Sequence, residues 1–139
     1  NIWTHGTLVT AMHGHLAFWG AYGMLIFAMI SYALPEMTGR KLYDGWIPEW
    51  AFWCANIGMV AMTGAFAVAG ITQVYLERRV GMDFLDVQEA VSVHFLGLVI
   101  AGALFTLGVV LFIWNFIRYG WPAARAIGPT GDSGVASTK

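Results

Sequence analysis

Three long, nearly uncharged apolar stretches, separated by two short polar segments, set out the organisation of the chain. An apolar stretch of about 20 residues or more is long enough to cross a lipid bilayer as a helix. A helix satisfies its own backbone hydrogen bonds, which an isolated strand in lipid cannot do. The pattern therefore predicts transmembrane helices over about residues 4–34, 47–76 and 87–117.

A proline marks the expected end of the first helix. Pro35 lacks a backbone donor and restricts the residue before it, so the helix is expected to stop at Leu34. The predicted fold is an all-α integral membrane bundle of three transmembrane helices over residues 1–120. Residues 121–139 contain little that could form a core and are expected to be a disordered tail.

Small residues recur along the second apolar stretch. Small side chains let two helix backbones approach closely in a membrane. The stretch is therefore expected to pack tightly against its neighbours, through Ala61, Gly64, Ala65, Ala67, Ala69 and Gly70.

The overall composition supports a membrane protein. Hydrophobic residues make up 58% of the chain and charged residues 11%, with a mean hydropathy of +0.65. Soluble domains carry about 25% charged residues. The net charge of -1 gives no reason to expect a nucleic-acid partner. The chain starts at Asn1 without the basic segment of a signal peptide, so we expect it to be a piece of a longer chain whose remainder lies upstream.

Basic residues beside the apolar stretches predict the orientation. Cytoplasmic loops carry an excess of Lys and Arg. The second polar segment has two of them, Arg78 and Arg79. The first segment and the C-terminal region together have five, namely Arg40, Lys41, Arg118, Arg125 and Lys139. We therefore expect the C-terminus to be cytoplasmic and the His5 end to face the outside.

Two histidines lie inside the first apolar stretch. At about 100° per residue, His13 and His15 are about 200° apart on a helix, so they cannot bind one metal ion together. Imidazole is a common ligand of metals, including haem iron. One interpretation is two haems, one against each face of the helix, with Gly14 between the histidines allowing their close approach. The alternative is that each imidazole packs and hydrogen-bonds against a neighbouring helix, with Gly14 at a helix contact.

The other two histidines lie outside this pair. His5 precedes His13 by a helical rise of about 12 Å, which places it near the membrane surface. It would lie beside haem propionates or simply in interfacial water. His94 is about 7 Å into the third helix and is expected to be a surface or packing residue. No further cluster of histidines with an acid occurs at membrane depth, so no non-haem metal site is expected in this chain.

A resemblance follows from these motifs. His5-Gly6-Thr7 and the run His13-Gly14-His15-Leu16-Ala17-Phe18-Trp19-Gly20-Ala21-Tyr22 resemble the tenth helix of the haem-copper oxidase superfamily. Within it, they resemble the large subunits of cytochrome c-dependent nitric oxide reductases. Oxidases usually carry Phe where this chain has Gly14. The likeness continues through residues 30–35 and 69–76. It implies that the three helices are the last three of a twelve-helix subunit.

The resemblance also implies roles for the histidines. His13 would be the proximal ligand of the catalytic haem b3, His15 one axial ligand of haem b, and His5 a neighbour of the haem b3 propionates. Nitric oxide would be reduced to nitrous oxide and water by two electrons and two protons for every two molecules. The non-haem iron ligands would lie upstream, so this chain alone is not expected to be active.

The implied setting is the bacterial cytoplasmic membrane, with the His5 end in the periplasm. Partners would be the upstream part of the same subunit, the lipid bilayer and a membrane-anchored c-type cytochrome, with calcium as a further candidate ligand. A quinol-dependent nitric oxide reductase or a cbb3-type oxidase carries a similar histidine pair. The residues also leave open a pure electron-transfer haem protein or a structural membrane protein with packing histidines.

Overall fold

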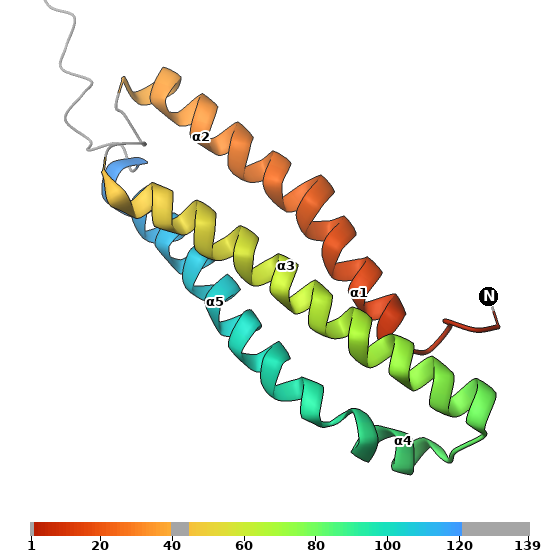
Figure 1. Cartoon of the computed structure of the whole chain (residues 1–139). Coiled ribbons are helices and arrows are strands. Elements are labelled where there is room, and N and C mark those ends of the chain that lie inside the picture. The colour runs from red at the N-terminus through yellow and green to blue at the C-terminus, as the bar shows by residue number, and fades with distance from the viewer. Residues whose placement is uncertain (1, 40–44, 121–139) are drawn as a thin grey trace, which may run out of the picture.

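The computed structural model describes residues 2–39 and 45–120, and all regular structure in these ranges is helical. Three helical rods are long and apolar enough to span a membrane, over Leu8–Met37, Trp46–Val80 and Val93–Arg118. Figure 1 shows them side by side, with successive rods running in opposite directions. The predicted all-α membrane fold is confirmed.

The first rod consists of α1 (Leu8–Ala17), the π-helical segment η1 (Phe18–Gly23) and α2 (Met24–Thr38). The expected stop at Leu34 is wrong, because α2 continues through Pro35. It ends at Gly39, where a φ of 64° allows the Gly39 amide to donate to the Pro35 carbonyl at 2.8 Å. Proline removes one donor, but a left-handed glycine at the C-cap is what ends the helix.

The second rod is α3 (Trp46–Tyr75) with the π-helical segment η2 (Leu76–Val80), close to the predicted range. The third rod is α4 (Phe84–Val91), α5 (Val93–Asn115) and the π-helical segment η3 (Phe116–Gly120). It begins earlier than predicted and is interrupted at Ser92. There the Ser92 hydroxyl donates to the Glu89 carbonyl at 2.6 Å, a local bond that competes with the helix ladder.

The two later rods pack closely through glycine. A methyl group added at Gly58 would collide with the backbone of Phe105, and one added at Gly108 would collide with the backbone of Ala55. Close approach of two backbones is the usual basis of helix association in lipid. The α3–α5 pair is therefore the closely packed unit against which the first rod packs.

The predicted packing of small residues on the second rod is only partly found. Ala69 and Gly70 are buried, and a methyl group on Gly70 would collide with the backbone of α1 at Leu8 and Val9. Gly64 meets no described atom, and the tightest contact is at Gly58, which the pattern did not single out. Small size permits contact, but only the arrangement of the rods decides where contact occurs.

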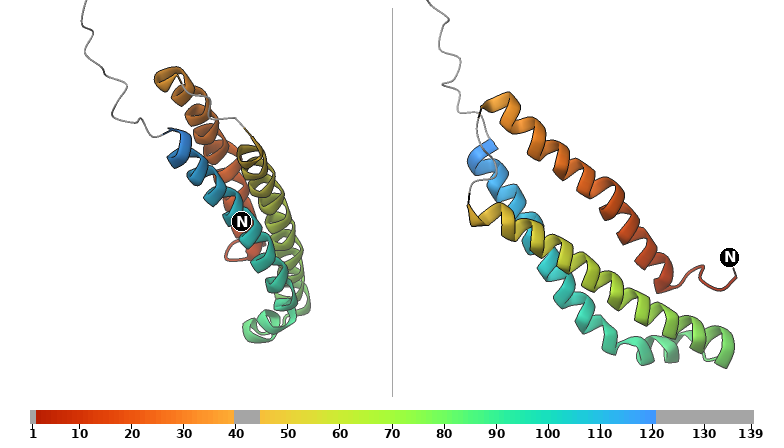
Figure 2. Two further views of the ribbon diagram at one scale, coloured as in Figure 1. Left: turned by 90° about the vertical axis from the view of Figure 1, so that its left-hand side faces the viewer. Right: turned by 45° about the horizontal axis from the view of Figure 1, so that its top comes forward.

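The first rod keeps most of its apolar surface uncovered. Figure 2 shows it close to the second rod at α1 and further from it toward the end of α2. No residue in the most apolar window of this rod is buried by the described chain. The exposed fractions reach 57% at Leu25 and 75% at Tyr32. An apolar surface of this extent is typical of a face covered by lipid or by further protein.

Candidate functional site

His13 and His15 both lie in α1, which is α-helical throughout. Their side chains therefore leave the helix about 200° apart. Both histidines are exposed in the described chain, but His15 lines a groove between the rods and His13 is not part of that lining. Within the described ranges, no group of three or more His, Cys, Asp or Glu side chains is placed to hold a metal ion. The structure thus gives the two imidazoles different surroundings.

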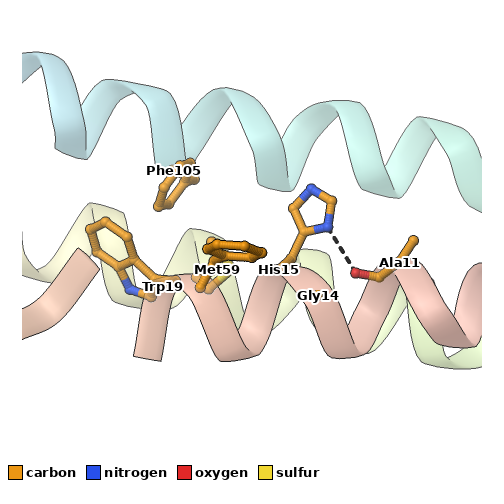
Figure 3. Close-up of a pocket in the computed structure, with 7 residues that line it drawn as sticks. Ala11, Gly14, His15, Trp19, Met59 and Phe105 are labelled. Carbon is orange, nitrogen blue, oxygen red and sulfur yellow. Dashed lines mark hydrogen bonds between the residues drawn. The ribbon is translucent and has the colours of Figure 1, made fainter. Parts of the chain in front are cut away.

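The groove beside His15 has a volume of about 560 Å³ and is formed by all three rods. The first rod supplies most of the lining, and α3 and α5 supply one side chain each. The lining residues are Ala11, Gly14, His15, Phe18, Trp19, Met59 and Phe105. Figure 3 shows the His15 ring projecting from α1 toward α5, with Trp19 and Phe105 at one end of the groove. A pocket with apolar walls and one polar group is typical of ligand sites.

One ring nitrogen of His15 is already engaged. Nδ1 lies 2.8 Å from the carbonyl oxygen of Ala11. A carbonyl can only accept, so Nδ1 donates to it, and in the neutral tautomer Nε2 is the nitrogen left with a lone pair. The ring also lies 5.0 Å from the Phe66 ring, centroid to centroid. A backbone carbonyl that fixes the ring and its tautomer is the usual support of a metal-ligating histidine.

Gly14 lines the same groove as His15. A methyl group built on Gly14 meets no described atom within 4 Å outside its own helix turn. The alternative of a helix contact at this glycine is therefore not found within residues 2–39 and 45–120. Glycine here leaves the groove wide next to the imidazole.

An aromatic wall closes one end of the groove. Trp19 makes edge contacts with Phe105 and Phe27, at centroid distances of 4.8 and 5.2 Å. Phe27 in turn stacks on Phe112 of α5 at 3.9 Å. A second cavity of about 130 Å³ lies on the far side of Trp19. The Trp19 indole therefore separates the His15 groove from an apolar cavity deeper in the bundle.

The sequence analysis did not identify the residues that form the walls of the groove. Trp19 could have been found by its spacing, since it lies one helical turn after His15 and so shares its face. Met59 and Phe105 carry no such signal, because nothing in their own segments relates them to α1.

His5 and His94 both lie outside the groove. His5 is exposed and belongs to the turns that precede α1, rather than to the helix predicted there. Gly6, with a φ of 75°, stands between it and the helix. His94 is partly exposed in the first turn of α5, which fits the expected surface or packing role.

Comparison with known proteins decides the family. Residues 1–104 match the family described as Cytochrome C and Quinol oxidase polypeptide I. The chain belongs to this family, in the haem-copper oxidase superfamily. The predicted superfamily is therefore confirmed, and membership implies haem as the cofactor.

Individual relatives fall within the same superfamily. The chain is 36% identical over 132 residues to a nitric oxide reductase subunit from Stutzerimonas stutzeri, covering 86% of this chain and 27% of that protein. It is 31% identical over 122 residues to a cytochrome c oxidase subunit 1 homolog of Agrobacterium tumefaciens and 30% identical to cytochrome c oxidase subunit 1 of Rhodobacter capsulatus. Each of these two matches covers 83% of this chain and 23% of the relative. The chain thus spans about a quarter of the length of these oxidoreductases.

The site around His15 fits such a haem. An imidazole whose Nδ1 is held by a backbone carbonyl, an open glycine beside it and apolar walls on three rods suit a flat, apolar macrocycle held by iron. His13, on the opposite face of α1, does not line this groove.

Proposed function

We propose that this chain is the C-terminal part of the catalytic subunit of a membrane nitric oxide reductase. The enzyme reduces two nitric oxide molecules to nitrous oxide and water with two electrons and two protons. Support comes from the 36% identity to the Stutzerimonas stutzeri nitric oxide reductase subunit and from Gly14, which stands where oxidases usually have Phe.

The observation that carries this proposal is the His15 imidazole in its groove. His15 would hold haem b through Nε2, and the Ala11 carbonyl would keep the ring in place. Bound in this way with a second histidine, the haem supplies one-electron transfer. The lining of the groove is largely apolar, and Trp19 lies at one end of it.

His13 has the complementary role on the opposite face of α1. It would hold haem b3, which would supply the site for nitric oxide reduction, and His5 would lie near the propionates of that haem. A single regular helix carrying both ligands fixes the two irons at a short separation. The exposure of His13 fits a site that other parts of the subunit complete.

The remaining parts of the enzyme lie outside this chain. The second axial histidine of haem b and the non-haem iron ligands come from upstream helices, and the described residues hold no cluster that could replace them. A membrane-anchored c-type cytochrome delivers electrons at the periplasmic face, where a bound calcium ion is a further candidate. The protein lies in the bacterial cytoplasmic membrane with the His5 end in the periplasm. The fragment alone does not turn over.

Two related functions are the alternatives. The identity to cytochrome c oxidase subunit 1 proteins favours a cbb3-type oxidase as one of them, and a quinol-dependent nitric oxide reductase is the other. Consumption of nitric oxide and of dioxygen by the full complex, with reduced cytochrome c or a quinol as donor, separates the three.

Substitution of the two histidines tests the proposed ligands. In the full-length complex, His15→Ala should abolish the low-spin haem spectrum, whereas His13→Ala should change the high-spin, ligand-binding spectrum. His94→Ala, a histidine outside the groove, is the matched control and should leave both spectra intact. Protohaem is quantified by the pyridine haemochrome assay. Identical losses from the two changes, or a complex without protohaem, would refute the proposal.

A further inference from the structure

The N-terminus of α1 is capped by a residue from another rod. The first amide groups of a helix have no partner within the helix. Thr7 stands at the N-cap position, but its hydroxyl donates to the Thr4 carbonyl at 2.8 Å and does not cap. The Leu8 amide donates instead to Oε1 of Gln73 on α3, at 3.0 Å and 65 positions along the chain.

Both ends of the Gln73 amide are engaged. The residue is only 3% exposed. Its Nε2 donates to Oε1 of Glu77 at 2.9 Å, one turn further along the rod. Because the carboxylate can only accept, it orients the amide with the oxygen toward Leu8. The three groups form one directed chain of hydrogen bonds from α1 across α3.

The contact between α1 and α3 beside this hydrogen bond is apolar. Gly70, one turn before Gln73, lies against the backbone of Leu8 and Val9. Such a contact holds two helices close but tolerates sliding along their axes, because dispersion forces are not directional. A hydrogen bond weakens steeply when its length or angle changes. The Leu8–Gln73 bond therefore fixes the height at which α1 sits on α3.

We propose that Gln73 is a positioning residue for the haem ligands on α1. This inference rests on the proposed function, in which His13 and His15 bind haem iron. His15 lies about 10 Å further along the same helix than Leu8, so any shift of the helix start moves the imidazole with it. Gln73 itself does not line the His15 groove, so it acts through the helix.

A matched control lies on the same rod. Asn56 also has a side-chain amide on α3, but its Nδ2 donates at 2.8 Å to the Phe52 carbonyl within its own helix. Asn56→Leu removes an amide without touching α1, whereas Gln73→Leu removes the tie between the rods.

The test uses the full-length complex and measures the low-spin haem by electron paramagnetic resonance and by its midpoint potential. Gln73→Leu should shift the g values and the potential, because the imidazole meets the iron at a changed angle. It should also lose haem to apomyoglobin about tenfold faster than wild type, as for other groups that orient metal ligands. Asn56→Leu should match wild type in all three. A purely structural role would lower the yield of Gln73→Leu but leave the spectrum of the surviving holoprotein unchanged, which would overturn the inference.

A double substitution supplies the rescue. Gln73→Glu keeps an acceptor for Leu8 but places a carboxylate against Glu77, so it should shift the spectrum. Adding Glu77→Gln reverses the donor and acceptor of that pair and restores both hydrogen bonds. The double variant should therefore return to wild-type g values, and failure to do so would count against the inference. If wild type itself holds no low-spin haem, the proposed function fails. If wild type holds that haem and Gln73→Leu leaves its g values, potential and rate of haem loss unchanged, only the positioning role fails.

Discussion

Substitution of Gly58 or Gly108 by alanine would test how closely α3 and α5 must approach each other behind the groove. The added methyl at position 58 would lie 2.7 Å from Cα of Phe105, and the one at position 108 would lie 2.7 Å from Cα of Ala55. Both obstacles are backbone atoms, which cannot rotate away as a flexible side chain would. The helices must separate to accept either substitution.

The magnitude follows from two opposing effects. Extra atoms in a well-packed interface cost about 1–3 kcal/mol. Alanine in place of glycine in a water-exposed helix gains about 1 kcal/mol. The net destabilisation from each substitution is therefore about 0–2 kcal/mol, and we expect the upper half of this range because the obstacles are backbone atoms. The two contacts lie one turn apart on both helices, so separation caused by one substitution makes room for the other. We expect the double variant to cost less than the sum by at least about 0.5 kcal/mol.

Unfolding of the purified complex in mixed detergent micelles, titrated with a denaturing detergent, measures these effects. Gly102→Ala is the control, because a methyl group there meets only Sδ of Met62, at an ordinary contact distance of 3.8 Å. Its midpoint should equal or exceed that of wild type. Equal midpoints for Gly58→Ala, Gly102→Ala and wild type would refute the close-packing argument.

Two further predictions concern the groove. Ala11→Phe fills the groove one turn before His15 and should remove the low-spin haem spectrum while leaving the high-spin spectrum in place; retention of both spectra would show that haem b binds elsewhere. Trp19→Ala joins the groove to the cavity behind it and should cost about 3 kcal/mol, the low end for a large aromatic side chain, because the residue is only partly buried. Trp19→Phe should recover most of this loss in the same unfolding assay. An unfolding midpoint unchanged by Trp19→Ala would contradict the role of Trp19 as a wall between the groove and the cavity.

Local sequence patterns were enough to predict the class of protein and its three transmembrane segments. The length of an apolar run is set by bilayer thickness, and the angle between His13 and His15 is set by the helix pitch. Neither depends on any distant residue. The sequence motifs around these histidines also pointed to the haem-copper oxidase superfamily, which the family match confirms.

The ends of the helices were harder to predict from the sequence, because several local signals compete. Pro35 predicted a stop that the structure places at Gly39, since proline near the end of a helix removes one hydrogen bond without unwinding it. The third rod was predicted as one helix, but the side-chain bond at Ser92 divides it. The expected disorder of residues 121–139 and four of the five basic residues that were expected to be cytoplasmic fall outside the described residues.

The sequence by itself determined that His15 lies on a membrane helix facing away from His13. Only the tertiary structure decided what faces His15: Met59 and Phe105 close its groove, and Gln73 caps the helix that carries it. The physical reason is that these rods are apolar on nearly every side, so no polar face records how each one is rotated. Backbone contact at glycines holds the rods close together and one buried amide joins two of them, and both contacts are between residues far apart in the chain.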